Sequence, residues 1–261
     1  MNVFKDQCGR EVIIPDFPQR IISVVPSQTE LLYDLDLGER VAGITKFCIH
    51  PDEWFRSKPR IGGTKNLNLK DIASLKPDLI IANKEENTRG ELESLAGNFP
   101  VWISDVKTLD EAKEMILHVG EITASEEKAE KLSNYIGSAF NSMQPLDPQL
   151  RALYLIWRNP WMAVNSDTFI HDMMRICGLE NCTAGAMLRY PVITEEEIRA
   201  MNPDLILLSS EPFPFADKHI DELKKIYPAA RIGLVDGESF SWYGSRLCIS
   251  PFYLQKLIDF W

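Results

Sequence analysis

The sequence predicts an α/β protein of two similar Rossmann-like lobes, each with a central, mainly parallel sheet, joined by a single long helix. The first observation is a repeated plan: a capped short helix, a proline that stops it and a continuous apolar strand, seen at 68–82 and again at 194–208. Pro-Asp-Leu-Ile recurs within it, at 77–80 and 203–206. Continuous apolar strands are typical of parallel sheets that are covered on both faces.

The second observation is an amphipathic segment at 125–144, between the two repeats. Its apolar residues recur at spacings of three and four, which predicts one helix with one buried stripe. The Pro-Leu-Asp-Pro segment that follows ends it. We therefore expect an N-terminal lobe at 1–124, a bridging helix at 125–144 and a C-terminal lobe at 145–261.

Local signals predict the elements of the first lobe. Ser27 is expected to cap a helix with Glu30 at the capping-box position, and Asn68 to cap another with Asp71. Thr108 and Glu111 predict the same arrangement for a third helix. In order, the lobe should contain a hairpin at 6–15, a strand at 20–25, a helix from 27, a strand at 41–44, a loop at 45–54, a helix from 68, a strand at 79–82, a helix at 91–96, a strand at 101–104 and a helix from 108.

The second lobe repeats this order at a nearly constant offset. Thr194 and Glu197 form its clearest capping box, and Gly178 is expected to end the helix before it. In order, we expect a strand at 151–157, a helix at 167–177, a helix from 194, strands at 205–208 and 232–235, and a terminal helix from about 251. The near-constant offset indicates an internal duplication.

The composition of the chain argues against several classes of function. Hydrophobic residues make up 45% and charged residues 25% of the 261 residues, as in an ordinary globular protein. A net charge of −10 argues against nucleic acids and anionic membranes as partners. No apolar run approaches the length of a membrane-spanning helix, and the first residues lack the basic-then-apolar pattern of a signal peptide. Either the native protein is cytoplasmic, or a leader has been removed and replaced by Met1.

The five cysteines do not form a metal-binding or disulfide pattern. Their odd number and the lack of a C-x-x-C motif favour reduced, mostly buried thiols. A local pair between Cys177 and Cys182 remains an alternative.

Three segments, in order, resemble one family. They are PQRIISVVPSQTELLYDLDLG at 18–38, GGTKN with LKPDLIIAN at 62–83, and SWYGSRL at 241–247. They are similar to the periplasmic substrate-binding proteins of ABC importers for cobalamin, siderophore iron and haem, whose lobes are bridged by one rigid helix (the class III type). The cobalamin-binding branch is the most similar. The resemblance implies a protein that holds cobalamin or a related metal chelate between its lobes without chemistry, cofactor or resident metal, with iron-siderophore or haem as the alternative ligand. We expect a monomer, because a lobe pair with one cleft needs no second copy.

The resemblance also implies two residues that dock onto a membrane permease. In cobalamin-binding members, one acidic residue of each lobe contacts permease arginines. Here the matching positions are Glu30 in SQTEL and Glu196 in TEEEI. Each position also has a purely structural interpretation, because a capping box explains Glu30 and the helix dipole explains Glu196.

Ligand contacts are expected just beyond the strand ends, because doubly wound folds bind ligands there. Aromatic side chains suit a large flat ligand, and Arg246 could bind a carboxylate or phosphate. For each aromatic residue, core packing is the competing interpretation, and for Glu85 and Glu86 it is a solvated charged surface. His50 could be a loop residue or an axial metal ligand. The candidates are Phe47, His50, Thr64, Lys65, Glu85, Glu86 and Asn87 in the first lobe, and Trp157, Arg158, Trp161, Phe213, Phe215, Trp242, Tyr243 and Arg246 in the second.

Two rival functions stay open. An enzyme that handles a metal or tetrapyrrole could use the same architecture, although the sequence carries no G-x-S-x-G, H-E-x-x-H, P-loop or G-x-G-x-x-G motif. A cytoplasmic carrier or sensor without a transporter would differ from the importer component in partner and not in ligand. The expected protein is nevertheless a binding protein and not an enzyme.

Overall fold

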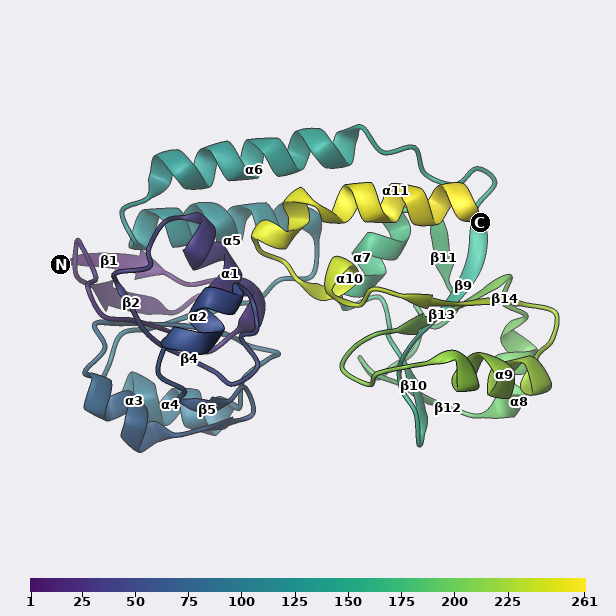
Figure 1. The fold of residues 1–261 in the computed structure, drawn as a ribbon, viewed down its shortest axis with the longest axis horizontal. Helices are drawn as coiled ribbons and strands as arrows, with labels where there is room; N and C mark the ends of the chain where they lie inside the picture. Colours follow the sequence, from purple (N-terminus) through teal and green to yellow (C-terminus); the bar gives the residue numbers. More distant parts are fainter. The chain divides into compact units, whose positions relative to one another are not determined.

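The computed structural model describes residues 1–261, and the chain forms two compact units (Figure 1). The first unit consists of Met1–Val106, Asp110–Ser138 and Trp242–Cys248, and the second of Lys107–Leu109, Ala139–Ser241 and Ile249–Trp261. The chain passes from the first unit to the second within α6 (Glu126–Asn141), the helix predicted at 125–144. It also returns to the first unit for the short segment 242–248.

The first unit is built on a four-stranded parallel sheet in the order β4-β3-β7-β8. Side chains of α3 and α4 pack with Ile22, Ile80 and Val101 on one face. On the other face α5 approaches Trp102, and α1 hydrogen-bonds to Ser23 and Ser104. The unit is therefore doubly wound. Its parallel strands and helices are β3 (Ile21–Ser23), α1 (Pro26–Asp34), β4 (Val41–Ile44), α2 (Asp52–Ser57), α3 (Leu69–Leu75), β7 (Leu79–Asn83), α4 (Arg89–Ala96), β8 (Val101–Ser104) and α5 (Leu109–Ile122).

Two hairpins complete the first unit: β1 (Asn2–Lys5) with β2 (Glu11–Ile14), and β5 (Gly62–Gly63) with β6 (Asn66–Leu67). The turn of the first hairpin covers the edge of β8. Gln7 N–H donates to the Ile103 carbonyl at 3.2 Å, and the Arg10 guanidinium donates to the Val101 carbonyl at 2.8 Å. This edge strand is thereby protected from pairing with another chain.

The second unit contains a six-stranded mixed sheet in the order β12-β10-β9-β13-β14, with β11 also paired to β9. Strands β9, β11, β13 and β14 are parallel, whereas β10 runs antiparallel to both of its neighbours, β9 and β12. Helices α8 and α9 pack on one face. Its strands and helices are β9 (Leu150–Trp157), β10 (Trp161–Ala163), α7 (Phe169–Ile176), β11 (Leu179–Asn181), β12 (Val192–Ile193), α8 (Glu195–Met201), β13 (Leu205–Ser209), α9 (Asp217–Ile226), β14 (Arg231–Val235), α10 (Glu238–Ser241) and α11 (Ser250–Phe260). The 3-10 helix η1 (Ser245–Cys248) belongs to the first unit.

The repeated Pro-Asp has one structural role in both units. In the first, the Asp78 carboxylate accepts the N–H groups of Gln19 and Arg20 at 2.7 and 2.8 Å, and Asp78 N–H returns a bond to the Arg20 carbonyl at 3.1 Å. In the second, Asp204 accepts Arg151 N–H at 2.8 Å and returns a bond of the same length. Each aspartate thus fixes the start of the next strand against the first strand of its sheet.

Most predicted elements are present, but one predicted cap is wrong. The capping box of Thr194 and Glu197 and the Asn68 cap are confirmed. The Ser27–Glu30 box is not formed, because α1 begins one residue earlier at Pro26, which fits the first helical position, and Val25 is its N-cap. The hairpin expected at 6–15 begins earlier, with β1 at Asn2–Lys5. The elements that were not predicted are β5, β6, β10, β11, β12, α2, α9, α10 and η1. None of the helices combines the length and apolar character needed to cross a membrane.

Candidate functional site

The first candidate surface lies at the carboxyl edge of the first unit's sheet, where parallel strands end together. The loop after β7 is fixed by two asparagines. Asn83 Oδ1 accepts the N–H groups of Glu85 and Glu86 at 2.8 and 3.0 Å. Asn87 Oδ1 accepts Asn83 N–H at 2.9 Å, and its Nδ2 donates to the carbonyls of Val24 and Thr64. Asn87, expected to face the ligand, is 4% exposed and shapes the loop instead.

Phe47 and Lys65 lie on the same edge. Phe47 follows β4 and is 52% exposed, with the Lys46 ammonium 5.0 Å from its ring centre. A Cβ atom at Gly63 would stand 3.0 Å from the Phe47 ring, so the missing side chain lets the ring lie against the hairpin. Lys65 Nζ donates to the Glu85 carbonyl oxygen. The structure therefore brings Phe47, Lys65, Glu85 and Glu86 to one polar edge with one exposed aromatic ring.

A second group of predicted residues surrounds an ion pair inside the first unit, and we call it the Glu30–Arg246 cluster. Arg246 pairs with Glu30: Nε donates to Oε2 at 3.0 Å, and Nη2 lies within ion-pair distance of Oε1, at 2.8 Å. The guanidinium lies 5.2 Å from the Trp242 ring centre, and the His50 ring packs edge-on against Trp242 at 5.5 Å. The two charged side chains are only 13% and 18% exposed.

Burial shifts the pKa of the carboxyl in this cluster. Loss of solvation raises the pKa of the Glu30 carboxyl above its ordinary value, and the nearby charges of Arg246 and His50 oppose this rise without cancelling it. The carboxylate is therefore stabilised by its partners but not by water. Because Glu30 is not a capping residue, the N-terminus of α1 does not account for the stabilisation of its carboxylate.

The cluster also changes the assignment of three predicted residues. Trp242, Tyr243 and Arg246 were expected in the C-terminal lobe, but the segment 242–248 belongs to the first unit. The reason is a close approach to α1: a Cβ at Gly244 would lie 2.4 Å from the Ser27 carbonyl oxygen, which only glycine avoids. Trp242 and Tyr243 are 7% and 4% exposed, so both pack as interior residues.

The second unit carries an aromatic cluster after β9 and β13. Trp157 meets Phe213 edge to face at 5.5 Å, and Phe213 meets Phe215 at 4.8 Å. Phe215 stacks on Trp161 at 6.1 Å with an interplanar angle of 8°. Trp161 and Phe215 are buried in the core, whereas Trp157 is 39% exposed and Phe213 is partly exposed. The outer pair, Trp157 and Phe213, offers the aromatic surface.

Arg158 lies beside this cluster, and its side chain already pairs with a glutamate. Its guanidinium lies 4.2 Å from the Trp161 ring centre and makes a bidentate contact with Glu222 of α9, through Nε and Nη2. This hydrogen bonding lowers the pKa of Glu222 and raises that of Arg158. Both side chains therefore stay charged near neutral pH.

The second predicted docking residue, Glu196, lies in the first turn of α8. Its side chain is 83% exposed, and Arg199 stands 3.7 Å away. Glu197 closes the capping box, so Glu196 has no role in the cap.

Sequence reasoning missed His219 and Glu222. His219 is buried against Phe213 and Phe215, each at 5.3 Å, and its Nδ1 accepts Ala216 N–H at 2.9 Å. Both residues are on α9, which was not predicted. The spacing of Ile220, Leu223 and Ile226 was the available signal for that helix. The five cysteines, Cys177 and Cys182 among them, are free thiols.

Comparison with known proteins identifies the family. The family model described as periplasmic binding protein matches residues 21–230. The chain belongs to the periplasmic binding protein family. It is therefore a solute-binding protein and not an enzyme, and the doubly wound units joined through α6 are those of the class III type.

Curated relatives agree with this assignment. A vitamin B12-binding protein from Pectobacterium carotovorum is 25% identical over 239 residues, which is 89% of this chain and 86% of that protein. A Bacillus subtilis protein described as an uncharacterized ABC transporter substrate-binding lipoprotein, YvrC, is 28% identical, covering 77% of this chain and 67% of that protein.

Solved structures show the same fold. The periplasmic vitamin B12-binding protein BtuF of Vibrio cholerae has a TM-score of 0.78 at 21% identity, over 94% of this chain and 98% of that one. The periplasmic haem-binding protein HutB of the same species has a TM-score of 0.78 at 20% identity, over 92% and 98%. The family is extracytoplasmic, which supports that predicted location and gives no support to a cytoplasmic protein.

Proposed function

We propose that this periplasmic binding protein holds a corrinoid, such as cobalamin, for an ABC importer, with haem or a siderophore-iron chelate as the alternative. The observation that carries the proposal is the Trp157–Phe213 pair beyond β9 and β13, in which Trp157 is exposed and Phe213 is partly exposed. Such a surface gives wide apolar contact to a large planar ligand at little cost in side-chain entropy. The vitamin B12-binding relatives support the corrinoid, and the haem-binding structural neighbour supports the alternative.

The polar edge of the first unit is a second candidate contact surface. Phe47 is the apolar surface there, and Glu85 and Glu86 stand on a loop that Asn83 and Asn87 hold in place. A fixed loop loses little conformational entropy on binding, which favours affinity. We assign ligand contact to Phe47, Trp157 and Phe213, and an indirect supporting role to Trp161 and Trp242, because both are nearly buried.

Titration with cyanocobalamin, haemin and a ferric siderophore tests the ligand, with calorimetry and the absorbance of each chromophore as readouts. Trp157→Ala and Phe47→Ala should each weaken the true ligand about tenfold to a hundredfold, as expected for aromatic contacts at a binding site. Tyr135→Ala is the control, since Tyr135 is 51% exposed on α6. Equal affinity in all variants would remove the aromatic contacts from the proposal, and no binding of any probe would reject this ligand class.

We further propose docking to the importer's permease through Glu196 and Glu30, as a monomer. Glu196 is accessible, whereas both oxygens of Glu30 are held by Arg246. Docking through Glu30 then requires a permease cation to replace Arg246, so Glu196 should carry more of the affinity. Binding to a reconstituted permease should fall about tenfold in Glu196→Gln and less in Glu30→Gln. Glu126→Gln, another first-turn acid, is the control, and sedimentation tests the monomer.

A further inference from the structure

Lys46 directly precedes Phe47, the exposed ring of the first unit's polar edge, and its side chain lies on that ring. The Lys46 ammonium is 5.0 Å from the centre of the Phe47 ring. The Lys46 N–H donates to the Gly62 carbonyl at 2.8 Å, which ties this loop to the hairpin of β5 and β6. Both side chains are exposed. The edge therefore carries a cation on its aromatic surface, and the proposed function gives that cation no role.

Gly63 makes room for both side chains. A Cβ atom at Gly63 would stand 3.0 Å from the Phe47 ring and 3.2 Å from Lys46 Cε. Both approaches are tighter than ordinary van der Waals contact, so the missing side chain lets the lysine stem and the ring lie together against the hairpin. Moving the Lys46 side chain aside would give up its contacts with the ring and with this glycine.

The Lys46 ammonium has no carboxylate partner in the protein. It forms none of the ion pairs within 4.0 Å. Lys65, the other lysine of this edge, differs because its Nζ donates to the Glu85 carbonyl oxygen. Lys46 is therefore the cation of this edge that is left for a ligand.

A flat ligand that covers Phe47 must also cover this ammonium. Taking a charged group out of water without a partner is costly, whereas a charge-assisted hydrogen bond to an anionic oxygen offsets that loss. A ligand with an uncharged margin would lose affinity at this point. The edge therefore favours a planar ligand that carries an anionic group beside its flat body.

We infer that Lys46 is a specificity-determining residue, which binds an anionic oxygen at the margin of the ligand. That oxygen belongs to a phosphodiester in a corrinoid and to a carboxylate in a haem. Phe47 contacts the flat body while Lys46 Nζ donates to the anion beside it. Glu85 and Glu86 oppose an anion, so it binds at Lys46 and not over their loop. This inference rests on the proposed function and narrows it to anionic chelates.

Two matched pairs of probes test the role of Lys46. Dicyanocobinamide is a corrinoid without the phosphodiester of cyanocobalamin, and haemin dimethyl ester lacks the free carboxylates of haemin. Each probe is titrated into the wild-type protein and into Lys46→Gln, with calorimetry and the absorbance of the chromophore as readouts. Lys46→Gln should weaken the anionic member of the pair that binds about tenfold, since one charge-assisted hydrogen bond is lost. The affinity for the other member should change little, and Lys46→Arg should retain most of the wild-type affinity for both.

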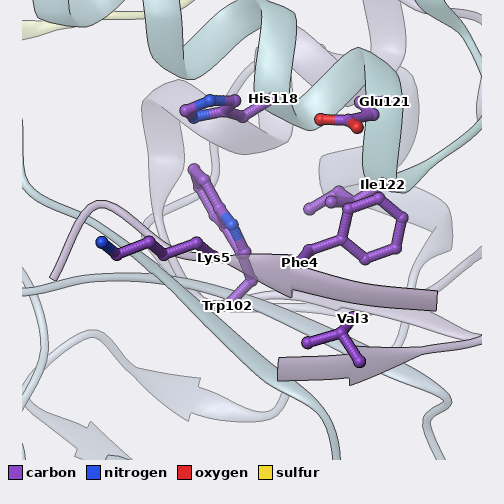
Figure 2. A pocket seen from close by; sticks show the side chains of 7 residues that line it. All are labelled: Val3, Phe4, Lys5, Trp102, His118, Glu121 and Ile122. Carbon is purple, nitrogen blue, oxygen red and sulfur yellow. The ribbon is translucent and has the colours of Figure 1, made fainter. Parts of the chain in front are cut away.

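Lys5→Gln is the matched control, because Lys5 is another exposed lysine of the first unit that forms no ion pair. It borders a cavity of about 220 Å³ between β1, β8 and α5, to which neither Lys46 nor Phe47 contributes (Figure 2). Lys5→Gln should change the affinity for neither member of a pair. An equal loss for both members in Lys46→Gln, or no loss for the anionic one, would overturn the inference and leave the proposed function in place. No binding of any of the four probes to the wild type would instead reject the proposed function, and this inference with it.

Discussion

Replacing Arg246 by methionine should destabilise the first unit in a manner that depends on pH. The guanidinium pairs with Glu30, and the two side chains are 13% and 18% exposed. Methionine keeps much of the apolar contact with Trp242 but leaves the Glu30 carboxylate without its cation. The loss should therefore be electrostatic and should appear only where Glu30 is ionised.

The magnitude follows from how deeply the pair is buried. Exposed ion pairs contribute about 0.2–1 kcal/mol, and removing one partner of a fully buried pair costs about 3–5 kcal/mol. With most of both side chains shielded, Arg246→Met should cost about 2 kcal/mol at pH 8, between these limits. That free energy corresponds to a shift of roughly 1 M in the urea midpoint for an ordinary m-value.

The pH dependence has a definite sign. Burial already raises the pKa of Glu30 in the folded protein, so its contribution to stability is greatest at low pH and falls as pH rises through that pKa. Without Arg246 the pKa rises further, because the charge that opposed the rise is gone. The cost of the variant should therefore shrink as pH falls and the carboxyl takes up its proton, and grow toward pH 8, where the carboxylate is left without its cation.

Hydrogen-exchange mass spectrometry across a urea series measures this in the peptides of β3 and β7. Because the chain forms two units, peptide-level exchange reports the stability of each unit separately, and the β13 peptide serves as an internal control that should not shift. Glu30→Gln with Arg246→Met completes a double-mutant cycle and should recover much of the loss. Arg56→Met is the matched control, because Arg56 pairs with Asp52 in open solvent. A cost that is equal at pH 4 and pH 8, or no coupling in the cycle, would refute the reasoning.

Three further changes follow from single contacts. Thr194→Ala should lower the free energy of unfolding by about 1 kcal/mol, because it removes the N-cap bond to Glu197 N–H; thermal unfolding measures the change. Ser27→Ala is the control and should cost less, because it removes no cap. Asn87→Ala should lower the free energy of unfolding by about 2–3 kcal/mol in urea denaturation, since it leaves two buried backbone groups and one partly buried one with one partner fewer. An unchanged midpoint would contradict its role in the loop. Gly63→Ala should move the Phe47 ring, given the 3.0 Å approach, and weaken ligand severalfold with little change in melting temperature; unchanged affinity would show that Phe47 does not contact the ligand.

The sequence allowed the scaffold to be predicted because the scaffold depends on local chemistry. A proline that stops a helix, an aspartate beside it and an apolar strand act within a few residues, and Asp78 and Asp204 make the same contacts in both units. The capping box at Thr194 depends only on residues three positions apart. Such signals need no knowledge of the rest of the fold.

The Glu30–Arg246 cluster could not be predicted in this way, because its two charged residues are 216 positions apart. The local sequence pattern predicted a capping role for Glu30. In the structure its carboxylate pairs with Arg246 instead. The short strands β10, β11 and β12 were missed for a similar reason: two or three residues become a strand only when a neighbouring strand offers hydrogen bonds. Whether an aromatic residue is core or surface also depends on its neighbours, as Trp157 and Trp161 show.

The two units share a scaffold, yet the loops that follow equivalent strands carry different chemistry. After β7 the loop presents acids and is held by asparagine side chains. After β13 the loop leads to aromatic residues and is held by Ser209, whose hydroxyl donates to the Glu211 carbonyl at 2.6 Å, while Ser241 donates to the Glu211 carboxylate at 2.6 Å. Because both loops are fixed by side-chain hydrogen bonds, they lose little conformational entropy when a ligand binds. Loosening either loop should therefore reduce affinity even where every contact residue is retained, which distinguishes a preorganised surface from one that forms around its ligand.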